Sequence, residues 1–231
     1  MASQMKPLRL YGGILGPNPG KVAVLLTELR VPFETVTIPI SDVKNPEYTA
    51  VNPNGRLPTL IDPNNGRIKI WESGAIIEYI IEKYDMDHEL SYPQGTEKYY
   101  HCKQFLHYQM SGQGPYFGQA WVFTHYWPEK LPAVIGRYMK EIKRVHGVLE
   151  GILAGRDWLV GDKCTYADLA FMTWEEIAMT LAEQNPGFYD IEKDFPNVHA
   201  WQKRITEKPL LKQLSQERIV LMDKVMAAGR E

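Results

Sequence analysis

Apolar residues in the first third of the chain alternate between short runs and one longer helical pattern. The short runs have the length and β-branched content of strands, and the longer stretch has apolar residues at helical spacing. Polar and Gly/Pro-rich segments separate them. In chain order, the expected elements are a strand at 8–11, a helix at 21–29, and strands at 33–38, 59–61 and 68–70.

The last two runs flank the turn signal Asp62-Pro63-Asn64-Asn65-Gly66, which predicts a hairpin. A helix is then expected from Glu72 to Tyr84, because Ile76, Ile77, Ile80 and Ile81 share one helical face. The predicted order is strand-helix-strand followed by strand-strand-helix. This is the thioredoxin-like arrangement.

The chain changes character after a polar segment at 86–96, which is predicted to be a linker. Beyond it the pattern is helical throughout, without a convincing strand. The fold class is therefore an α/β N-terminal thioredoxin-like domain at 1–85 and an all-α C-terminal domain at 97–231. Its expected helices are 97–125, 129–154, 166–183, 196–207 and 209–227.

Composition narrows the classes of function. A formal charge of −2 without a basic stripe argues against nucleic acid and anionic membranes as partners. No apolar run approaches the ~20 residues that span a bilayer, and the N-terminus lacks a signal core, so a cytoplasmic location is expected. The two cysteines and six histidines show no metal-ligand spacing, so no metal is expected.

The tetrad Trp71-Glu72-Ser73-Gly74 opens the last helix of the first domain. A carboxylate there can bind an ammonium group, while the Ser hydroxyl and the first helical N–H groups can bind a carboxylate. The Leu57-Pro58 bond lies just upstream and is expected to be cis, presenting backbone groups rigidly. These features predict a site for a peptide-like zwitterion, such as glutathione.

The loop from Gly12 to Gly20 contains no Ser, Thr or Cys, which excludes a hydroxyl or an internal thiol from this loop. Asn18 is predicted to be the N-cap of the first helix, with Pro19 at the first helical position. Its amide can also donate to a bound thiolate. Lowering a thiol pKa from about 8.5 to about 6.5 requires roughly 2.7 kcal/mol, which one hydrogen bond and a helix terminus can supply. Tyr11 is the alternative donor, although a tyrosine at a strand end more often packs or lines a pocket.

A capping box is expected at Thr165-Tyr166-Ala167-Asp168, at the start of an apolar helix. Asp168 is therefore interpreted as a helix-nucleating residue and not as a catalytic one.

Three motifs in this order resemble a cytosolic glutathione transferase, and the similarity covers nearly the whole chain. They are Asn52-Pro53-Asn54-Gly55-Arg56-Leu57-Pro58, the pair Glu72-Ser73, and the segment from Gly161 to Asp168. Finer similarity to the fungal branch related to the yeast nitrogen-catabolite regulator is carried by Pro17-Asn18-x-x-Lys21-Val22, by Ile70–Ile76 and by Met110–Ala120.

The resemblance implies the glutathione transferase fold, glutathione as co-substrate, a homodimer and a role in detoxification. It implies that Asn18 stands near the sulfur and that Leu57 pairs its backbone with the cysteinyl unit beside Pro58. Glu72 and Ser73 would hold the γ-glutamyl end, with Arg56, Lys44 and Asn54 near the glycyl carboxylate.

The second substrate would be a hydrophobic electrophile in a pocket between the domains, where pockets tend to form. Gly112, Gly114 and Pro115 are expected to bend or break the helix at 97–125 and make room there. The candidate lining residues are Tyr11, Tyr108, Ser111, Tyr116, Phe117, Trp121 and Trp127.

Three functions stay open at this point. The first is conjugation of glutathione to an electrophile, with peroxidase as a side activity. The second is a glutathione-dependent isomerase or lyase step in a biosynthetic pathway. The third is a binding module for regulation without turnover.

Overall fold

A computed structural model describes residues 5–185 and 187–228. The chain divides into two compact units, one up to Glu89 together with the segment from Thr206 onward, and one from Leu90 to Ile205. The linker at 86–96 and the all-α domain at 97–231 stay predictions of the domain boundaries. In the structure α10 (Pro209–Ala228) packs against α1 (Pro17–Glu28) and belongs to the first unit.

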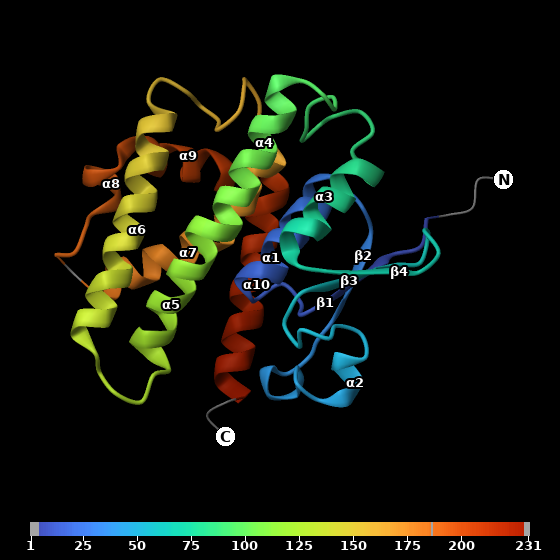
Figure 1. Ribbon diagram of the computed structural model, residues 1–231, viewed down its shortest axis with the longest axis horizontal. Coiled ribbons are helices and arrows are strands. Elements are labelled where there is room, and N and C mark those ends of the chain that lie inside the picture. Colours follow the sequence, from blue (N-terminus) through green and yellow to red (C-terminus); the bar gives the residue numbers. More distant parts are fainter. Residues whose placement is uncertain (1–4, 186, 229–231) are drawn as a thin grey trace. The chain divides into compact units, whose positions relative to one another are not determined.

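The first unit is built on a four-stranded mixed sheet in the order β2-β1-β3-β4 (Figure 1). β1 runs parallel to β2, and β3 is antiparallel to both β1 and β4. The strands are β1 (Leu8–Tyr11), β2 (Phe33–Val36), β3 (Thr59–Asp62) and β4 (Ile68–Trp71). The thioredoxin-like order expected from the sequence is confirmed.

Two long helices of the first unit bury apolar faces with the sheet. α1 buries a continuous stretch from Pro19 to Leu26. α3 (Ser73–Tyr84) buries all four isoleucines that share its predicted apolar face. Two short elements, the 3-10 turn η1 (Ile40–Asp42) and α2 (Pro46–Thr49), were not predicted from the sequence, because a single turn is too short to show periodicity.

A fully buried carboxylate, Asp62, ties the β3–β4 hairpin to α3. It accepts hydrogen bonds from the Tyr79 hydroxyl at 2.6 Å, from the Tyr84 hydroxyl, and from the Asn64 backbone N–H at 2.7 Å. Desolvation raises the pKa of Asp62, but these hydrogen bonds outweigh it and the net pKa is lowered.

Among its described residues, the second unit consists of helices joined by turns and loops, without a strand. Helix 97–125 was expected to be bent or broken, and the structure divides it into α4 (Glu97–Tyr108), a π-helical turn η2 (Gln109–Gln113) and α5 (Gly114–His125). Gly112 lies in this turn, and a Cβ there would come within 2.8 Å of the Tyr108 ring. The remaining helices are α6 (Pro132–Leu153), α7 (Tyr166–Gln184), α8 (Ile191–Asp194) and α9 (Pro196–Thr206).

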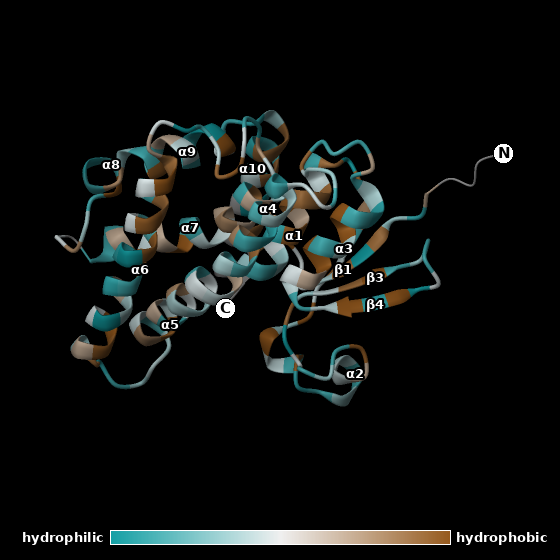
Figure 2. Cartoon of the chain, turned by 45° about the horizontal axis from the view of Figure 1, so that its top comes forward, coloured by the Kyte–Doolittle hydropathy of each residue, from teal (hydrophilic) through white to brown (hydrophobic). Residues whose placement is uncertain are grey.

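Helix α6 packs through one face, whereas the first half of α7 is buried on all sides. The buried residues of α6 recur at helical spacing, and Figure 2 shows hydrophobic and hydrophilic residues alternating along that helix. They are Met139, Ile142, Val145, His146, Leu149 and Leu153.

Asp168 begins α7 in the structural role expected for it. Its carboxylate accepts the Thr165 backbone N–H at 2.8 Å, the Leu159 N–H at 2.9 Å and the Trp201 indole N–H at 2.9 Å. The side chain is fully buried. With its oxygens occupied by these donors, Asp168 stabilises the start of the helix and the packing of α9.

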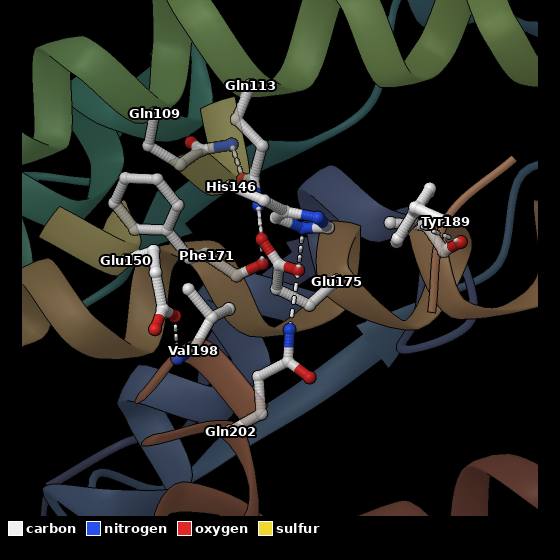
Figure 3. A network of polar contacts seen from close by, with 10 residues as sticks. Gln109, Gln113, His146, Glu150, Phe171, Glu175, Tyr189, Val198 and Gln202 are labelled. Atoms are coloured by element: carbon white, nitrogen blue, oxygen red, sulfur yellow. Dashed lines mark hydrogen bonds and ion pairs between the residues drawn. The ribbon is translucent and has the colours of Figure 1, made fainter. Parts of the chain in front are cut away.

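A second buried carboxylate, Glu175, links four elements of the helical unit (Figure 3). It accepts hydrogen bonds from the Gln113 side chain of η2 at 2.6 Å, from His146 Nε2 of α6 at 2.7 Å and from the Gln202 side chain of α9 at 2.6 Å. Gln109 donates in turn to Gln113 at 3.0 Å. The π-helical turn is thus attached to the core by a polar network that aromatic rings surround.

Candidate functional site

Strand register brings three chain segments together at one end of the sheet, where β1 and β4 end and β3 begins. Tyr11 at the end of β1 pairs with Thr59 at the start of β3, and Thr59 pairs with Trp71 at the end of β4. The residues that follow or precede these positions are Gly12, Pro58 and Glu72. The loop that leads to Asn18, the Leu57-Pro58 bond and the start of α3 therefore converge, although 60 residues separate them in the chain.

Gly12 allows the first loop to approach the segment before β3. Its φ is +108°, and a Cβ there would lie 2.8 Å from Pro19 Cγ and 3.0 Å from Leu57 Cβ. Only glycine combines this conformation with such close packing. The start of α1, which carries Asn18, is thereby held beside Leu57.

Asn18 is not the N-cap of α1, which corrects the sequence prediction. The helix begins at Pro17 with Gly16 as N-cap, so Asn18 is the second helical residue. Pro17 takes the first position because its fixed φ suits that position and it has no N–H to lose. Asn18 is half-buried in the first turn, and its side-chain amide is not the cap of this helix.

The Leu57-Pro58 peptide bond is cis, as expected from the sequence. The approach to it is fixed by hydrogen bonds to the Arg56 carbonyl, which accepts from the Asn52 amide at 2.7 Å and from the Tyr48 hydroxyl at 2.9 Å. Pro58 is buried, while the Arg56 side chain is exposed. The backbone of Leu57 is therefore held by its neighbours on both sides.

Lys44, Asn54 and Glu72 form a connected group. The Lys44 ammonium donates to the Asn54 carbonyl at 2.8 Å, and the Asn54 amide donates to the Glu72 carboxylate at 3.3 Å. Gly55 makes room for this arrangement, since a Cβ there would lie 2.6 Å from the Val43 carbonyl and 2.9 Å from Lys44 Cδ. The structure thus brings together three of the residues assigned to glutathione from the sequence.

Glu72 and Ser73 occupy the junction between β4 and α3. Glu72 is the N-cap position, with φ +70° and ψ 114°, and its side chain does not cap the helix. A non-glycine residue rarely has this conformation, which costs on the order of 1–3 kcal/mol and is most frequent at functional sites. Ser73 is buried as the first residue of α3, where N–H groups can bind an anion.

Lys21 is a buried cation that the sequence did not reveal as unusual. Its side chain is 1% exposed, on the same face of α1 as Asn18 three residues earlier. Desolvation lowers the pKa of Lys21 from 10.5 to about 7, and the charge of Glu72 opposes that shift only in part. Gain or loss of the Lys21 proton therefore changes the electrostatic potential at Glu72.

A groove lies between the first loop and one face of α10. Its volume is about 420 Å³. Residues 213, 216, 217, 220 and 221 fall on one side of a helix by their spacing, and Ile14 faces them from the loop before α1. We call this the α10 groove; its lining residues are Ile14, Gln213, Gln216, Glu217, Val220 and Leu221.

The residues proposed for the electrophile pocket on helix 97–125 occupy different environments. Phe117 is fully buried and its ring packs against His146 at 5.7 Å, so it is a core residue and not a pocket wall. The Ser111 hydroxyl donates to the His107 carbonyl at 2.8 Å. The Tyr108 hydroxyl is buried, which raises its pKa, while the Arg144 charge partly opposes that rise.

The aromatic residues further along α5 are more accessible. Tyr116 and Trp121 are half-buried, and the Trp121 ring lies 3.8 Å from the His125 ring. Trp127 is exposed beyond the end of α5. In the first unit, Tyr11 is half-buried with its ring 6.0 Å from that of Tyr48.

Neither a metal-binding cluster nor a membrane-spanning helix is found in the part of the chain that the structure describes. Within it no three His, Cys, Asp or Glu side chains cluster as a metal site would require. None of its helices combines the length and apolar character needed to cross a bilayer.

Comparison with known proteins matches both parts of the chain to one family. Residues 10–89 match the glutathione S-transferase N-terminal domain, and residues 115–209 match the glutathione S-transferase C-terminal domain. The chain is 46% identical to glutathione S-transferase-like protein gedE of Aspergillus terreus, over 92% of this chain and 96% of that protein. It is 42% identical to glutathione S-transferase 1 of Schizosaccharomyces pombe, over 95% of this chain and all of that protein.

A solved structure agrees in fold. Ure2p5 from Phanerochaete chrysosporium, cocrystallised with 1-(S-glutathionyl)-2,4-dinitrobenzene, superposes with a TM-score of 0.86 at 42% identity, covering 96% of this chain and 98% of that one. The two family matches, the identities and the shared fold agree with the motifs at Asn52–Pro58 and Glu72-Ser73. The chain therefore belongs to the glutathione S-transferase family, in the fungal group that resembles the Ure2-type transferases.

Proposed function

We propose that this end of the sheet in the first unit binds glutathione and that the protein adds its thiolate to an electrophilic carbon. One observation carries this assignment: the register of Tyr11, Thr59 and Trp71 aligns the Asn18 loop, the Leu57-Pro58 bond and the start of α3. A ligand lying across three adjacent strands can bind all three segments at once.

Each end of glutathione finds groups of suitable charge in this arrangement. Glu72 would bind the γ-glutamyl ammonium, while Ser73 and the N–H groups of α3 would bind the adjacent carboxylate. Lys44, Asn54 and Arg56 would surround the glycyl carboxylate, and the Leu57 backbone would pair with the cysteinyl unit. The hydrogen bonds that join Lys44, Asn54 and Glu72 hold these groups ready before the ligand arrives.

The thiol would lie toward Asn18, in the first turn of α1. The amide can donate a hydrogen bond, and the positive end of the helix dipole favours the thiolate over the thiol. The similar Ure2p5, cocrystallised with a glutathionyl dinitrobenzene, supports conjugation as the reaction. Tyr11 stays the alternative donor at the end of β1.

The second substrate would bind partly in the α10 groove. Its apolar side chains, Ile14, Val220 and Leu221, lie next to the loop that leads to Asn18. The assignment of Tyr108, Ser111, Tyr116 and Trp121 to the electrophile stays a prediction from the sequence.

Two variants separate binding from thiol activation. Replacement of Asn18 by Ala should raise the thiol pKa of bound glutathione and lower kcat/KM for 1-chloro-2,4-dinitrobenzene by roughly 10- to 100-fold, the value of one hydrogen bond to a charged group. The Glu72→Gln variant should instead weaken glutathione binding and leave the pKa of bound thiol near the wild-type value.

The assay is a pH titration of the ultraviolet thiolate absorbance at saturating glutathione, together with calorimetric binding of glutathione. Absence of both a thiolate signal at neutral pH and turnover of several electrophiles would refute the catalytic function. Glutathione binding alone would then indicate a regulatory module.

We also propose that the protein acts in the cytoplasm as a detoxifying homodimer. Large apolar side chains are exposed at Trp71, Met86 and Tyr100, in or next to the helices 72–84 and 97–125 expected at the interface. Light scattering at micromolar concentration should give twice the chain mass of 26.6 kDa. A monomer under these conditions would exclude the dimer.

A further inference from the structure

The α10 groove combines an apolar floor with a single acidic side chain. Ile14, Val220 and Leu221 supply the apolar part, and Val220 and Leu221 are exposed rather than packed. Glu217 lies one helical turn before them on the same side of α10. The Gln213 amide donates to the Glu217 carboxylate at 3.0 Å.

The lining of the groove, as far as the structure describes it, contains no basic side chain. Its other polar groups are the amides of Gln213 and Gln216. A second substrate in this groove therefore meets a carboxylate with no Lys or Arg among the described lining residues.

The position of α10 makes this charge relevant to substrate choice. The buried face of the helix, with Leu211 and Leu214, packs in the first unit, and Lys208 forms an ion pair with Glu28 of α1 at 2.8 Å. These contacts fix the helix beside the loop that contains Ile14. The groove therefore lies in the same unit as Asn18, and Asn18 follows Ile14 by four residues in the chain.

We propose that Glu217 is a specificity residue that selects uncharged, apolar electrophiles and disfavours those that carry a carboxylate. This inference rests on the proposed transferase function. The Coulomb energy between two unit charges ~4 Å apart in a water-like medium corresponds to a discrimination of about fivefold. Reversing the charge at position 217 doubles the change in Coulomb energy, and this corresponds to a change in discrimination of about 25-fold.

The test compares two electrophiles that react by the same step. With 1-chloro-2,4-dinitrobenzene or 4-chloro-3,5-dinitrobenzoate, the glutathione thiolate forms a C–S bond at the carbon that bears chlorine. Chloride leaves with the C–Cl electron pair, and the thiol proton has gone to solvent. Only the second substrate carries a carboxylate, so the ratio of kcat/KM values, each divided by the uncatalysed rate, reports charge selection.

We expect the ratio of neutral over carboxylated substrate to fall about fivefold in Glu217→Gln and about 25-fold in Glu217→Lys, mainly through KM of the benzoate. The matched control for Glu217→Lys is Glu34→Lys on β2, which changes the net charge by the same amount outside the groove and should leave the ratio unchanged. At about 1 M salt the wild-type discrimination should shrink, because the Debye length falls to about 3 Å.

The assignment would be overturned if both variants at position 217 kept the wild-type ratio of kcat/KM values. It would also be overturned if Glu34→Lys changed that ratio as much as Glu217→Lys does. Glutathione binding by calorimetry should be the same in all four proteins. If the wild type conjugates neither electrophile, the transferase function itself fails; if it conjugates both and the ratios are equal, only the role of Glu217 fails.

Discussion

Replacement of the buried Lys21 by Met should stabilise the protein in a pH-dependent way. The wild-type ammonium is buried in α1, and its pKa is lowered from 10.5 to about 7. Each pKa unit corresponds to about 1.4 kcal/mol, so a shift of this size implies a penalty of about 5 kcal/mol for keeping the charged form folded. Met fills a similar volume without a charge to desolvate.

The sign of the pH dependence follows from proton binding. Below pH 7 both folded and unfolded chains hold the Lys21 proton, so the penalty is constant. Between pH 7 and pH 10.5 the unfolded chain holds the proton and the folded chain does not. The free energy of unfolding of the wild type should therefore rise by about 1.4 kcal/mol per pH unit from this group.

The assay is urea unfolding followed by tryptophan fluorescence at pH 6, 7, 8 and 9, at one protein concentration. The advantage of Lys21→Met over the wild type should be largest at pH 6 and fall by roughly 2–3 kcal/mol between pH 7 and pH 9. Lys83→Met on the exposed side of α3 is the control and should show a constant difference. Parallel curves for the wild type and Lys21→Met would refute the lowered pKa.

Three further substitutions test the packing around the site and the core. Gly12→Ala should weaken glutathione binding measured by calorimetry and cost about 1–2 kcal/mol of stability, whereas Gly66→Ala, with a positive φ but open space around it, should lose stability alone. Equal glutathione affinity in both would contradict the role of Gly12. Asp62→Asn should lower the free energy of unfolding by roughly 1–3 kcal/mol at pH 7 and reduce its loss on acidification, since a carboxylate with a lowered pKa stabilises above its ordinary pKa and loses that effect as pH falls. Thermal unfolding at pH 3 and pH 7 measures this, and equal acid sensitivity would contradict it. Glu175→Gln should cost roughly 1–3 kcal/mol for each buried donor left unpaired, against no change in the exposed Glu183→Gln control, as measured by urea unfolding. An unchanged midpoint would show that the network is dispensable.

Local patterns determined much of this fold. Strand and helix periodicity gave the order of elements in the first unit, and the isoleucines of α3 are buried as their spacing required. The cis bond before Pro58, the role of Asp168 at the start of α7 and an interruption near Gly112 were also predictable. Each of these depends on neighbouring residues and the backbone chemistry of Pro, Gly and capping side chains.

Other features depend on residues far apart in the chain. The N-cap of α1 is Gly16, because Pro17 occupies the first helical position. Pro19 suits that position equally well, and the sequence does not show which of the two prolines begins the helix. The burial of Lys21 and of Phe117 depends on how whole helices pack. Spacing alone places 213, 217 and 220 on one side of a helix, but it does not reveal that Ile14 faces them.

The sequence by itself determined that this chain has an acid-serine helix start after an X-Pro bond, and from it we predict a site for a small zwitterion. Only the tertiary structure decided that Tyr11, Thr59 and Trp71 align, that Glu72 is linked to Lys44 through Asn54, and that α10 joins the first unit. The physical reason is that periodicity and capping are read within a few residues, whereas strand register and helix packing are set by burial of side chains from distant segments.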